Sequence, residues 1–225
     1  MDNIKIIAHI KSDFKEKFGI PRQSGLSSSV ARIVFEKEYR NDDALRGIEG
    51  YSHLWLLWKF SKSERDSWSP TVRPPRLGGN KRVGVFATRS PFRPNPIGLS
   101  SVELLGIEKS DEGTVLVIKG ADLLNGTPIY DIKPYLAFTD SHPDAKGGFS
   151  DEKLLYNLNV SFPDELAKKV CEEKREVLKE ILSQDPRPSY IEDEKRIYGF
   201  EFDVYEIKFS VKGDTLFVVS VEEKK

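Results

Sequence analysis

The first 140 residues consist of short apolar segments, each followed by a loop that contains glycine or proline. Ile4, Ile6, Ala8 and Ile10 recur at every second position, which is the periodicity of a β-strand. Further segments of this kind cover residues 30–35, 52–60, 83–88, 97–108, 114–122 and 123–138. Many short strands joined by turns are typical of closed β architectures. We therefore expect a mainly β protein that begins with a small closed antiparallel β-barrel, spanning residues 1–142.

The character of the sequence changes after residue 140. Residues 140–152, DSHPDAKGGFSDE, are polar and contain two glycines and a proline, which indicates a linker. Residues 161–183 have apolar residues at helical spacing and predict one helix, with Ser161 as its cap. The last part predicts two strands around the turn at 212–214, with a bulge near Val204. We expect a small α+β C-terminal domain over residues 152–225.

Composition narrows the class of protein. The chain has 225 residues, a formal net charge of -1, one cysteine and three scattered histidines. A single cysteine excludes an internal disulfide framework and a cysteine-only metal site, and we expect no metal. The N-terminus lacks the apolar stretch of a signal peptide, and no apolar run approaches the roughly 20 residues of a membrane span. These features predict a cytoplasmic protein that does not contact a membrane.

One stretch of the chain is strongly basic. Residues 71–93 contain no aspartate or glutamate but hold six cations: Arg73, Arg76, Lys81, Arg82, Arg89 and Arg93. The stretch is either an ordinary solvated loop or a local site for anions such as phosphate. Charge alone leaves both interpretations open.

The end of that stretch, ATRSPFRPNPIGLS at residues 87–100, carries three prolines. Proline fixes φ and removes a backbone donor, so that no strand can run through this segment. We expect a stiff, extended loop that holds Arg89, Arg93 and Asn95 in fixed directions.

Common nucleotide-binding motifs are missing, because the chain has neither a G-x-G-x-x-G nor a G-x-x-x-x-G-K-[ST] sequence. A Rossmann-type cofactor site therefore has no support. Gly98 and Gly120 are positions where a backbone could approach a ligand closely, and Asp122 could accept hydrogen bonds from an amine or from ribose hydroxyls. The residues alone predict a polar ligand site that recognises an anion, and they predict no reaction.

Five motifs carry a resemblance to a known family. They are PRQSGL, RGIEGYSHLWLL, PTVRPPRLGGNKRVGVFATRSPFRPNPIGLSSVEL, DLLNGTPIYDIKPYL and QDPRPSY. In these motifs the chain resembles the TrmO family, also called TsaA-like or YaeB-like. The resemblance implies an S-adenosylmethionine-dependent methyltransferase that acts on N6 of threonylcarbamoyladenosine at position 37, in the tRNA anticodon loop. It also implies a non-Rossmann barrel and a homodimer with the cofactor near the subunit interface.

The resemblance further implies roles for individual residues. The implied cofactor contacts are Gln23, Ser24, Gly25, Leu26, Ser61, Lys62, Arg89, Leu99, Gly120, Ala121, Asp122 and Leu123. Ser61 departs from the family pattern, in which many relatives have histidine. The expected substrate contacts are Arg73, Arg76, Arg93, Asn95, Arg187 and Tyr190, and the expected catalytic group is Asp131 as a base, with Lys133 and Tyr135 beside it.

Several alternatives stay open. Asp131 could instead be a structural carboxylate paired with Lys133. Arg187 could pair with Asp185 and only hold the C-terminal domain in place. The whole protein could be an S-adenosylmethionine-binding sensor or a non-catalytic RNA-binding module.

Overall fold

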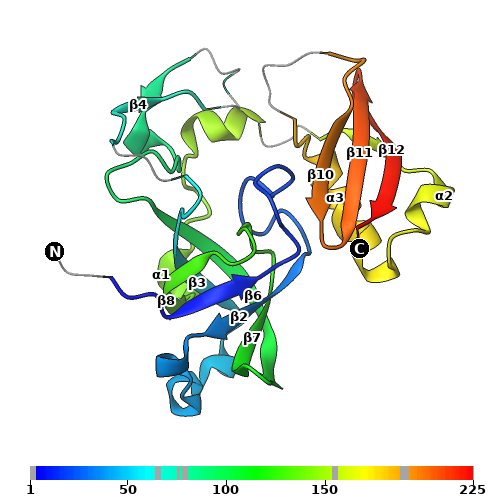
Figure 1. Ribbon diagram of the computed structural model, residues 1–225. Coiled ribbons are helices and arrows are strands. Elements are labelled where there is room, and N and C mark those ends of the chain that lie inside the picture. Colours follow the sequence, from blue (N-terminus) through cyan, green and yellow to red (C-terminus); the bar gives the residue numbers. More distant parts are fainter. Residues whose placement is uncertain are drawn as a thin grey trace.

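Six antiparallel strands close into a barrel in the first part of the chain, as the computed structural model shows (Figure 1). The structure describes residues 4–63, 67–74, 77, 81–153, 157–187 and 193–224. The strands, in their order around the barrel, are β1 (Ala8–Lys11), β2 (Val30–Phe35), β7 (Gly113–Lys119), β6 (Ile97–Ser110), β3 (His53–Lys59) and β8 (Pro128–Pro134). Strand β8 pairs back onto β1, with Ala8 opposite Ile129. The expected closed antiparallel barrel is confirmed.

The barrel interior follows from the two-residue period of its strands. In β3, Leu54, Leu56 and Trp58 point inward and are buried, whereas Trp55 and Leu57 face outward and are half-buried. Buried side chains of the neighbouring strands complete this apolar core.

Short connections cover one end of the barrel between β2 and β3. They contain three 3₁₀ turns: η1 (Lys37–Tyr39), η2 (Asp42–Leu45) and η3 (Ile48–Gly50). Asn41 caps η2 by accepting a hydrogen bond from the Asp43 amide at 3.0 Å.

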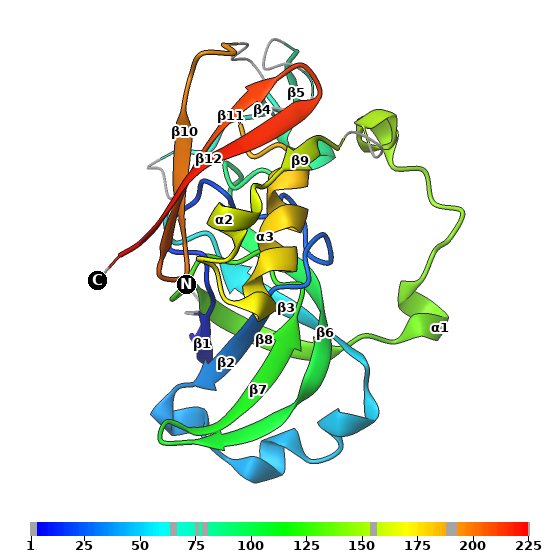
Figure 2. The same cartoon turned by 90° about the vertical axis from the view of Figure 1, so that its right-hand side faces the viewer.

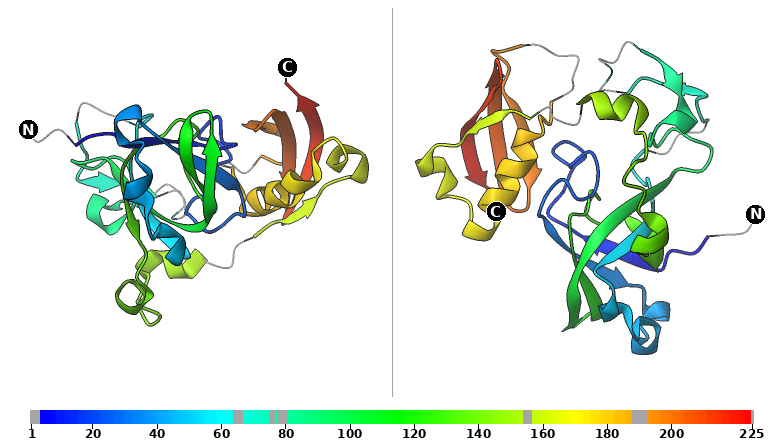
Figure 3. Two further views of the ribbon diagram at one scale, coloured as in Figure 1. Left: turned by 90° about the horizontal axis from the view of Figure 1, so that it is seen from below. Right: turned by 180° about the vertical axis from the view of Figure 1, so that it is seen from behind.

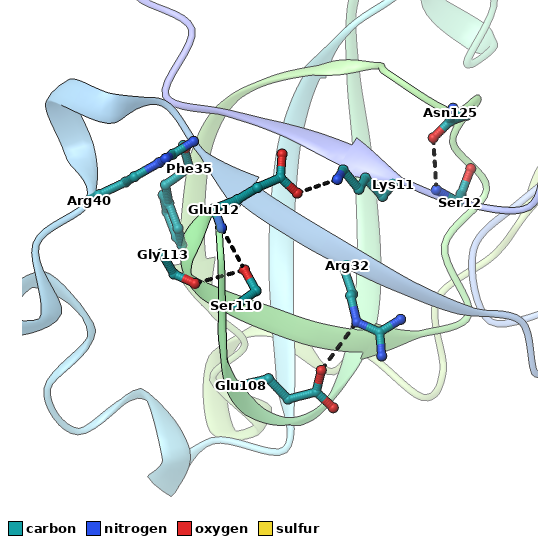
Figure 4. Close-up of polar contacts among 10 residues, drawn as sticks. All are labelled: Lys11, Ser12, Arg32, Phe35, Arg40, Glu108, Ser110, Glu112, Gly113 and Asn125. Carbon is teal, nitrogen blue, oxygen red and sulfur yellow. Dashed lines mark hydrogen bonds and ion pairs between the residues drawn. The ribbon is translucent and has the colours of Figure 1, made fainter.

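The hairpin of β6 and β7 turns where the sequence predicts it. The Ser110 hydroxyl donates to the Gly113 carbonyl at 2.9 Å and accepts from the Glu112 amide at 3.2 Å (Figure 4). Gly113 has a φ of 94°, which glycine adopts without strain. Across the same sheet, Arg32 of β2 pairs with Glu108 of β6 at 3.1 Å (Figure 4).

The prediction of one strand over residues 83–88 is wrong. Strand β5 (Val83–Gly84) pairs with β4 (Thr71–Val72) and then gives way to the 3₁₀ turn η5 (Val85–Ala87). After β8 the chain forms the short helix α1 (Ala137–Asp140) and, in the expected linker, the 3₁₀ segment η6 (Gly148–Lys153).

The C-terminal domain is a four-stranded sheet packed against a helix, as expected of an α+β unit. Its strands, in spatial order, are β10 (Tyr198–Phe202), β11 (Tyr205–Lys212), β12 (Thr215–Glu223) and β9 (Asn159–Ser161). Helix α3 (Glu172–Ser183) buries Val177, Leu178, Ile181 and Leu182 in the same core as the sheet.

Two details of this domain differ from the prediction. The expected single helix at 161–183 is two helices, α2 (Asp164–Ala167) and α3, separated by residues 168–171. Ser161 does not cap a helix, because it pairs with Phe217 in the sheet. The change of phase near Val204 is a hairpin turn between β10 and β11, in which Asp203 has a φ of 52°. The register shifts further on, between Lys208 and Phe209, and the extra residue is Val219 of β12.

The loop that follows β1 packs against the C-terminal domain and so holds the two domains together. Phe14 of this loop is buried in the core of the C-terminal domain and forms a β-bridge with Phe202. Lys174 of α3 binds Asp13 at 2.8 Å and also contacts Asp203. Figures 2 and 3 show the C-terminal domain beside the barrel, with α3 turned toward it. None of the helices in the described part of the chain combines the length and apolar character that a membrane span requires.

Candidate functional site

A cavity of about 630 Å³ lies where the loop after β1 meets the end of β3 and the proline-rich loop. Its walls come from four segments: residues 17–23, 58–63, 88–99 and 122–127. The proline-rich loop makes few backbone pairs, but the Arg93 amide donates to the Pro91 carbonyl and the Ile97 amide to the Asn95 carbonyl. These tight turns bend the loop at two places along the cavity wall, and its prolines restrict the backbone between them.

A chain of hydrogen bonds runs from the barrel core to the cavity. The Trp58 indole N–H donates to the Ser100 hydroxyl at 2.9 Å, and this hydroxyl donates to Asp122 Oδ1 at 2.5 Å. Burial raises the pKa of Asp122 above its usual value of 3.8, against the opposing effect of the bond from Ser100. The cavity therefore contains a carboxylate whose charge is poorly solvated, a setting that favours a cationic or hydrogen-bond-donating ligand.

Arg89 supplies the opposite charge on the same cavity. Its Nη1 donates to Gln23 Oε1 at 2.5 Å, which connects the proline-rich loop to the loop after β1. The positive charge of Arg89 also lowers the pKa of Asp122, although less than burial raises it. One cavity thus presents a guanidinium and a carboxylate, a pair that can bind a ligand carrying both charges.

The structure brings half of the expected cofactor residues to the cavity wall. Those that line it are Gln23, Ser61, Lys62, Arg89, Leu99 and Asp122. The other six are not part of the described lining, and two hydrogen bonds fix the backbone of some of them. The Gly25 amide donates to the Gly120 carbonyl at 2.8 Å, and the Ser101 amide donates to the Ser24 hydroxyl at 3.2 Å.

Ala121, Leu123 and Leu26 are three of the six expected cofactor residues that are absent from the described lining. Ala121 and Leu123 are buried in the barrel core, which leaves their neighbour Asp122 turned to the cavity. Leu26 is 43% exposed, and its carbonyl accepts a hydrogen bond from Gln184 of α3 at 2.7 Å.

Gly98 lines the cavity, and its missing side chain also makes room for a side chain of the protein. A Cβ atom at this position would lie 2.2 Å from the Trp58 ring, so that the close approach is to the indole. The absence of a side chain thereby allows Trp58 to reach Ser100. Gly120 has a φ of 83°, and a Cβ atom at this position would lie 3.3 Å from the Gly25 backbone. Both the backbone conformation and the lack of space therefore favour glycine here.

Two of the expected substrate residues line the cavity, Arg93 and Asn95. Arg73 is exposed and outside the described lining. Arg76 and Tyr190 lie outside the described residues.

Arg187 forms the local pair with Asp185 that the alternative to RNA binding requires. It makes a two-pronged pair with Asp185, at 2.8 and 2.9 Å, and its side chain is only 14% exposed. Direct RNA binding by Arg187 is untested, but this geometry favours the local role.

Asp131 and Lys133 lie on strand β8 and Tyr135 follows it directly, and the described lining of the cavity includes none of the three. Asp131 and Lys133 face outward, and Lys133 Nζ lies 2.6 Å from Asp131 Oδ2. This ion pair is the structural role that was the alternative to a catalytic role for Asp131. The Tyr135 ring lies 5.5 Å from the ring of Trp55, between centroids. Within a single chain, Asp131 is therefore not positioned to act as a base in this cavity.

Sequence reasoning missed Trp58 and Ser100. Ser100 occupies an inward position of β6, between Gly98 and Val102, where the two-residue period predicts an apolar side chain. A polar residue at such a position was the available signal, because a buried hydroxyl needs a partner. In the described part of the chain, no cluster of three or more histidine, cysteine, aspartate or glutamate side chains is arranged to hold a metal ion.

Comparison with known proteins identifies the family. The family model for the tRNA-methyltransferase O N-terminal domain matches residues 9–141, and the model for the TrmO C-terminal domain matches residues 156–224. A tRNA (adenine(37)-N6)-methyltransferase of Escherichia coli is 46% identical over 196 residues, covering 84% of this chain and 83% of that protein. The same enzyme of Eikenella corrodens is 43% identical over 172 residues, which are 76% of this chain and 97% of the relative.

Solved structures agree with these relatives. A crystal structure of TrmO from Pseudomonas aeruginosa superimposes with a TM-score of 0.79 and 31% identity, covering 99% of each chain. Both family models, the relatives and the fold point to one assignment. The chain belongs to the TrmO family of tRNA methyltransferases and contains both domains of that family.

Proposed function

We propose that the protein transfers a methyl group from S-adenosylmethionine to N6 of the adenosine at position 37 of tRNA. We further propose that the accepted base carries a threonylcarbamoyl group, so that the product is N6-methyl-N6-threonylcarbamoyladenosine. The observation that carries this proposal is the cavity with Arg89 and Asp122, found in a chain of this family.

The described cavity fits S-adenosylmethionine in size and charge. Its volume lies within the range of roughly 300–1,000 Å³ that is usual for small-molecule sites. Arg89 offers a guanidinium for the methionine carboxylate, and Asp122 offers an acceptor for the ammonium group or the ribose hydroxyls. Two relatives support the choice: one from Pseudomonas aeruginosa is named a putative S-adenosylmethionine-dependent methyltransferase, and one from Archaeoglobus fulgidus a probable S-adenosyl-L-methionine-binding protein.

When bound, the cofactor would supply a methyl group on a positively charged sulfur. In the reaction a bond would form between N6 and the methyl carbon, the bond from that carbon to sulfur would break with its electron pair left on sulfur, and the N6 proton would pass to a carboxylate base or to water. The task of the protein is to align N6 with that bond, and Arg93 and Asn95 at the cavity wall are suited to hold the phosphate, base or carboxylate of the substrate. Their rigid loop provides this alignment without further ordering.

We also propose that the protein acts as a homodimer through the outer face of β3, β6 and β8. Leu57 lies between Leu99 and Asp131 in the register of these strands, and Leu99 belongs both to this face and to the cavity wall. Leu99 is 47% exposed, which is unfavourable for an isolated apolar side chain at a ligand site. Pairing of two chains here would bury Leu99 and bring Asp131 of one chain toward the cavity of the other.

The test is transfer of labelled methyl from S-adenosylmethionine to two tRNA pools, one with and one without the threonylcarbamoyl group. We expect incorporation into the first pool and background in the second. Equal incorporation into both pools would remove the threonylcarbamoyl requirement. Cofactor binding without transfer to either pool would indicate a sensor, and RNA binding without cofactor binding would indicate a non-catalytic module.

A further inference from the structure

We propose that Trp68 and Phe86 form a stacking surface for unpaired RNA bases at the edge of the cavity. This inference rests on the proposed function, because it names the part of the molecule that would hold the single-stranded RNA around the target base. We call the two side chains the aromatic patch.

The aromatic patch is exposed although its members are large. Trp68 is 48% and Phe86 is 71% exposed. Their rings are stacked on one another, with centroids 6.1 Å apart and an angle of 26° between the planes. Neither ring fills a core, so that folding does not explain why two large aromatic side chains lie together at the surface. Exposed apolar patches of this kind are typical of binding surfaces.

The backbone holds this patch in a defined place. Trp68 lies three residues before Thr71, the first residue of β4, and Phe86 lies in η5 directly after β5, so that the β4–β5 ladder brings them together. The Val85 amide donates to the Pro70 carbonyl at 3.0 Å, and the Ser69 amide donates to the Phe92 carbonyl at 3.3 Å. The patch is therefore attached to the proline-rich loop.

Arg93 connects the aromatic patch to the cavity. Its guanidinium carbon lies 6.0 Å from the centre of the Phe86 ring, and its Nη1 donates to the Thr88 carbonyl at 3.1 Å. The same side chain lines the cavity. A base stacked on the patch would thus be a near neighbour of a base that enters the cavity.

The charge around the aromatic patch selects RNA as the partner. Phe86 lies in the stretch 71–93, which contains no acidic residue and includes the exposed cations Arg73, Lys81 and Arg82; Trp68 lies before this stretch and follows Glu64 and Asp66 in the sequence. Aromatic faces surrounded by cations are the combination that binds single-stranded nucleic acid, through base stacking and phosphate pairing. An apolar protein partner would require no such excess of positive charge.

The experiment is fluorescence anisotropy with two labelled RNA probes across a series of salt concentrations. One probe is a hairpin with the sequence of an anticodon stem-loop, and the other is a blunt duplex with the sequence of its stem. The variants are Trp68→Ala and Phe86→Ala, with Arg82→Gln for the phosphate component. Phe217→Ala is the matched control, because Phe217 is a 39% exposed aromatic residue on β12, and β12 lies across the molecule from β4 (Figure 1).

We expect each variant of the patch to weaken hairpin binding about tenfold with an unchanged salt slope, and to affect the duplex little. Arg82→Gln should lower the salt slope by about one unit, and Phe217→Ala should bind as the unchanged protein does. Trp68→Ala is the cleaner of the two patch variants, because Phe86 also contacts Arg93.

Hairpin affinity that is unchanged in both patch variants would overturn the inference, as would an equal loss of affinity for both probes. A change of oligomeric state in the patch variants, seen by light scattering, would assign the patch to a protein contact instead. Methyl transfer by the unchanged protein is measured in parallel. Its failure would count against the proposed function, whereas transfer and RNA binding unaffected by the variants would remove only the role of the patch.

Discussion

At the scale of single residues, Asp122 stands out because its charge is unfavourable in the protein without ligand. Burial raises the pKa of its carboxyl group, so that between the ordinary and the raised value the folded state holds more protons than the unfolded state. The free energy of unfolding must then fall as the pH rises through this interval. A bound ligand with a positive charge or hydroxyl groups would remove this penalty.

We therefore predict that Asp122→Asn keeps or raises the thermal stability of the protein without ligand and lowers its affinity for S-adenosylmethionine. In the absence of ligand, the melting temperature of the variant should equal or exceed that of the unchanged protein near pH 7, and this advantage should shrink toward pH 4. The affinity for S-adenosylmethionine should fall, by about tenfold for the loss of one charged hydrogen-bond partner. Calorimetric melting and titration at both pH values measure the two effects. The quantity to compare is the melting temperature of the variant minus that of the unchanged protein. A smaller difference at pH 7 than at pH 4 would contradict this interpretation of Asp122.

Individual site residues differed in how far the sequence could predict them. Arg89 and Asp122 were singled out as charged residues of loops and Gln23 through the family resemblance, and all three line the cavity. Gly98 also lines it, but only the fold shows that Trp58 occupies the space beside it. Asp131 was assigned to catalysis, although its nearest cation, Lys133, lies two residues away on the same face of the same strand.

At the scale of secondary-structure elements, helix α3 supports the loop that borders the cavity. Glu180 Oε2 accepts hydrogen bonds from the Ser28 amide at 2.6 Å and from the Ser28 hydroxyl at 2.8 Å. Gln184 Nε2 donates to the Leu26 carbonyl at 2.7 Å. The C-terminal domain thus holds residues 26–28, which follow Gln23 after Ser24 and Gly25, and we expect Glu180 to position this part of the site.

We predict that Glu180→Ala raises the KM for S-adenosylmethionine about tenfold and lowers kcat less, since charged hydrogen bonds of this kind contribute about 1.5–3 kcal/mol. Glu180→Gln, which keeps an acceptor oxygen, should recover part of the loss. Glu176→Ala is the control, because Glu176 lies on the same helix, is exposed and pairs with Lys179. Equal steady-state constants for the Glu180 and Glu176 alanine variants would show that α3 does not position the loop.

The elements themselves were predicted unevenly. The buried strands at 30–35 and 52–60 are close to the observed β2 and β3, because their β-branched and apolar residues leave few alternatives. Residues 83–88 have the same composition, yet β5 ends at Gly84, since its partner β4 has two residues. The helix predicted from Ser161 fails for a similar reason: pairing with β12 decides the state of Ser161, and local sequence does not show that partner.

At the scale of the whole molecule, Arg187 and Asp185 lie where the C-terminal domain meets the barrel. Asp185 is 8% exposed, and the Arg22 side chain donates to its carbonyl at 3.1 Å. We predict that Arg187→Ala destabilises the protein by about 1–3 kcal/mol, because the Asp185 carboxylate loses its charged partner. The melting temperature should fall by several degrees, and the salt dependence of tRNA binding should not change. A salt slope reduced by about one unit at normal thermal stability would instead support a direct RNA contact.

The proposed homodimer gives a prediction for the outer face of the barrel. Leu57→Glu places a charge in the centre of this face, where burial of an unpaired carboxylate is costly. We expect the variant to be monomeric by light scattering at micromolar concentration, to melt as a folded protein and to lose most of its transferase activity. Lys109→Glu serves as the control, since Lys109 is an exposed residue of β6 away from this face. A variant at Leu57 that remains dimeric would place the subunit contact elsewhere.

The most direct test of the account is mass spectrometry of nucleosides from tRNA incubated with the protein and S-adenosylmethionine. The account predicts N6-methyl-N6-threonylcarbamoyladenosine from the unchanged protein. It also predicts a strong reduction with Arg89→Ala, whose affinity for the cofactor should fall by about 10- to 100-fold. The absence of this nucleoside with fully threonylcarbamoylated tRNA, or its undiminished formation by Arg89→Ala at limiting cofactor, would contradict the central claim.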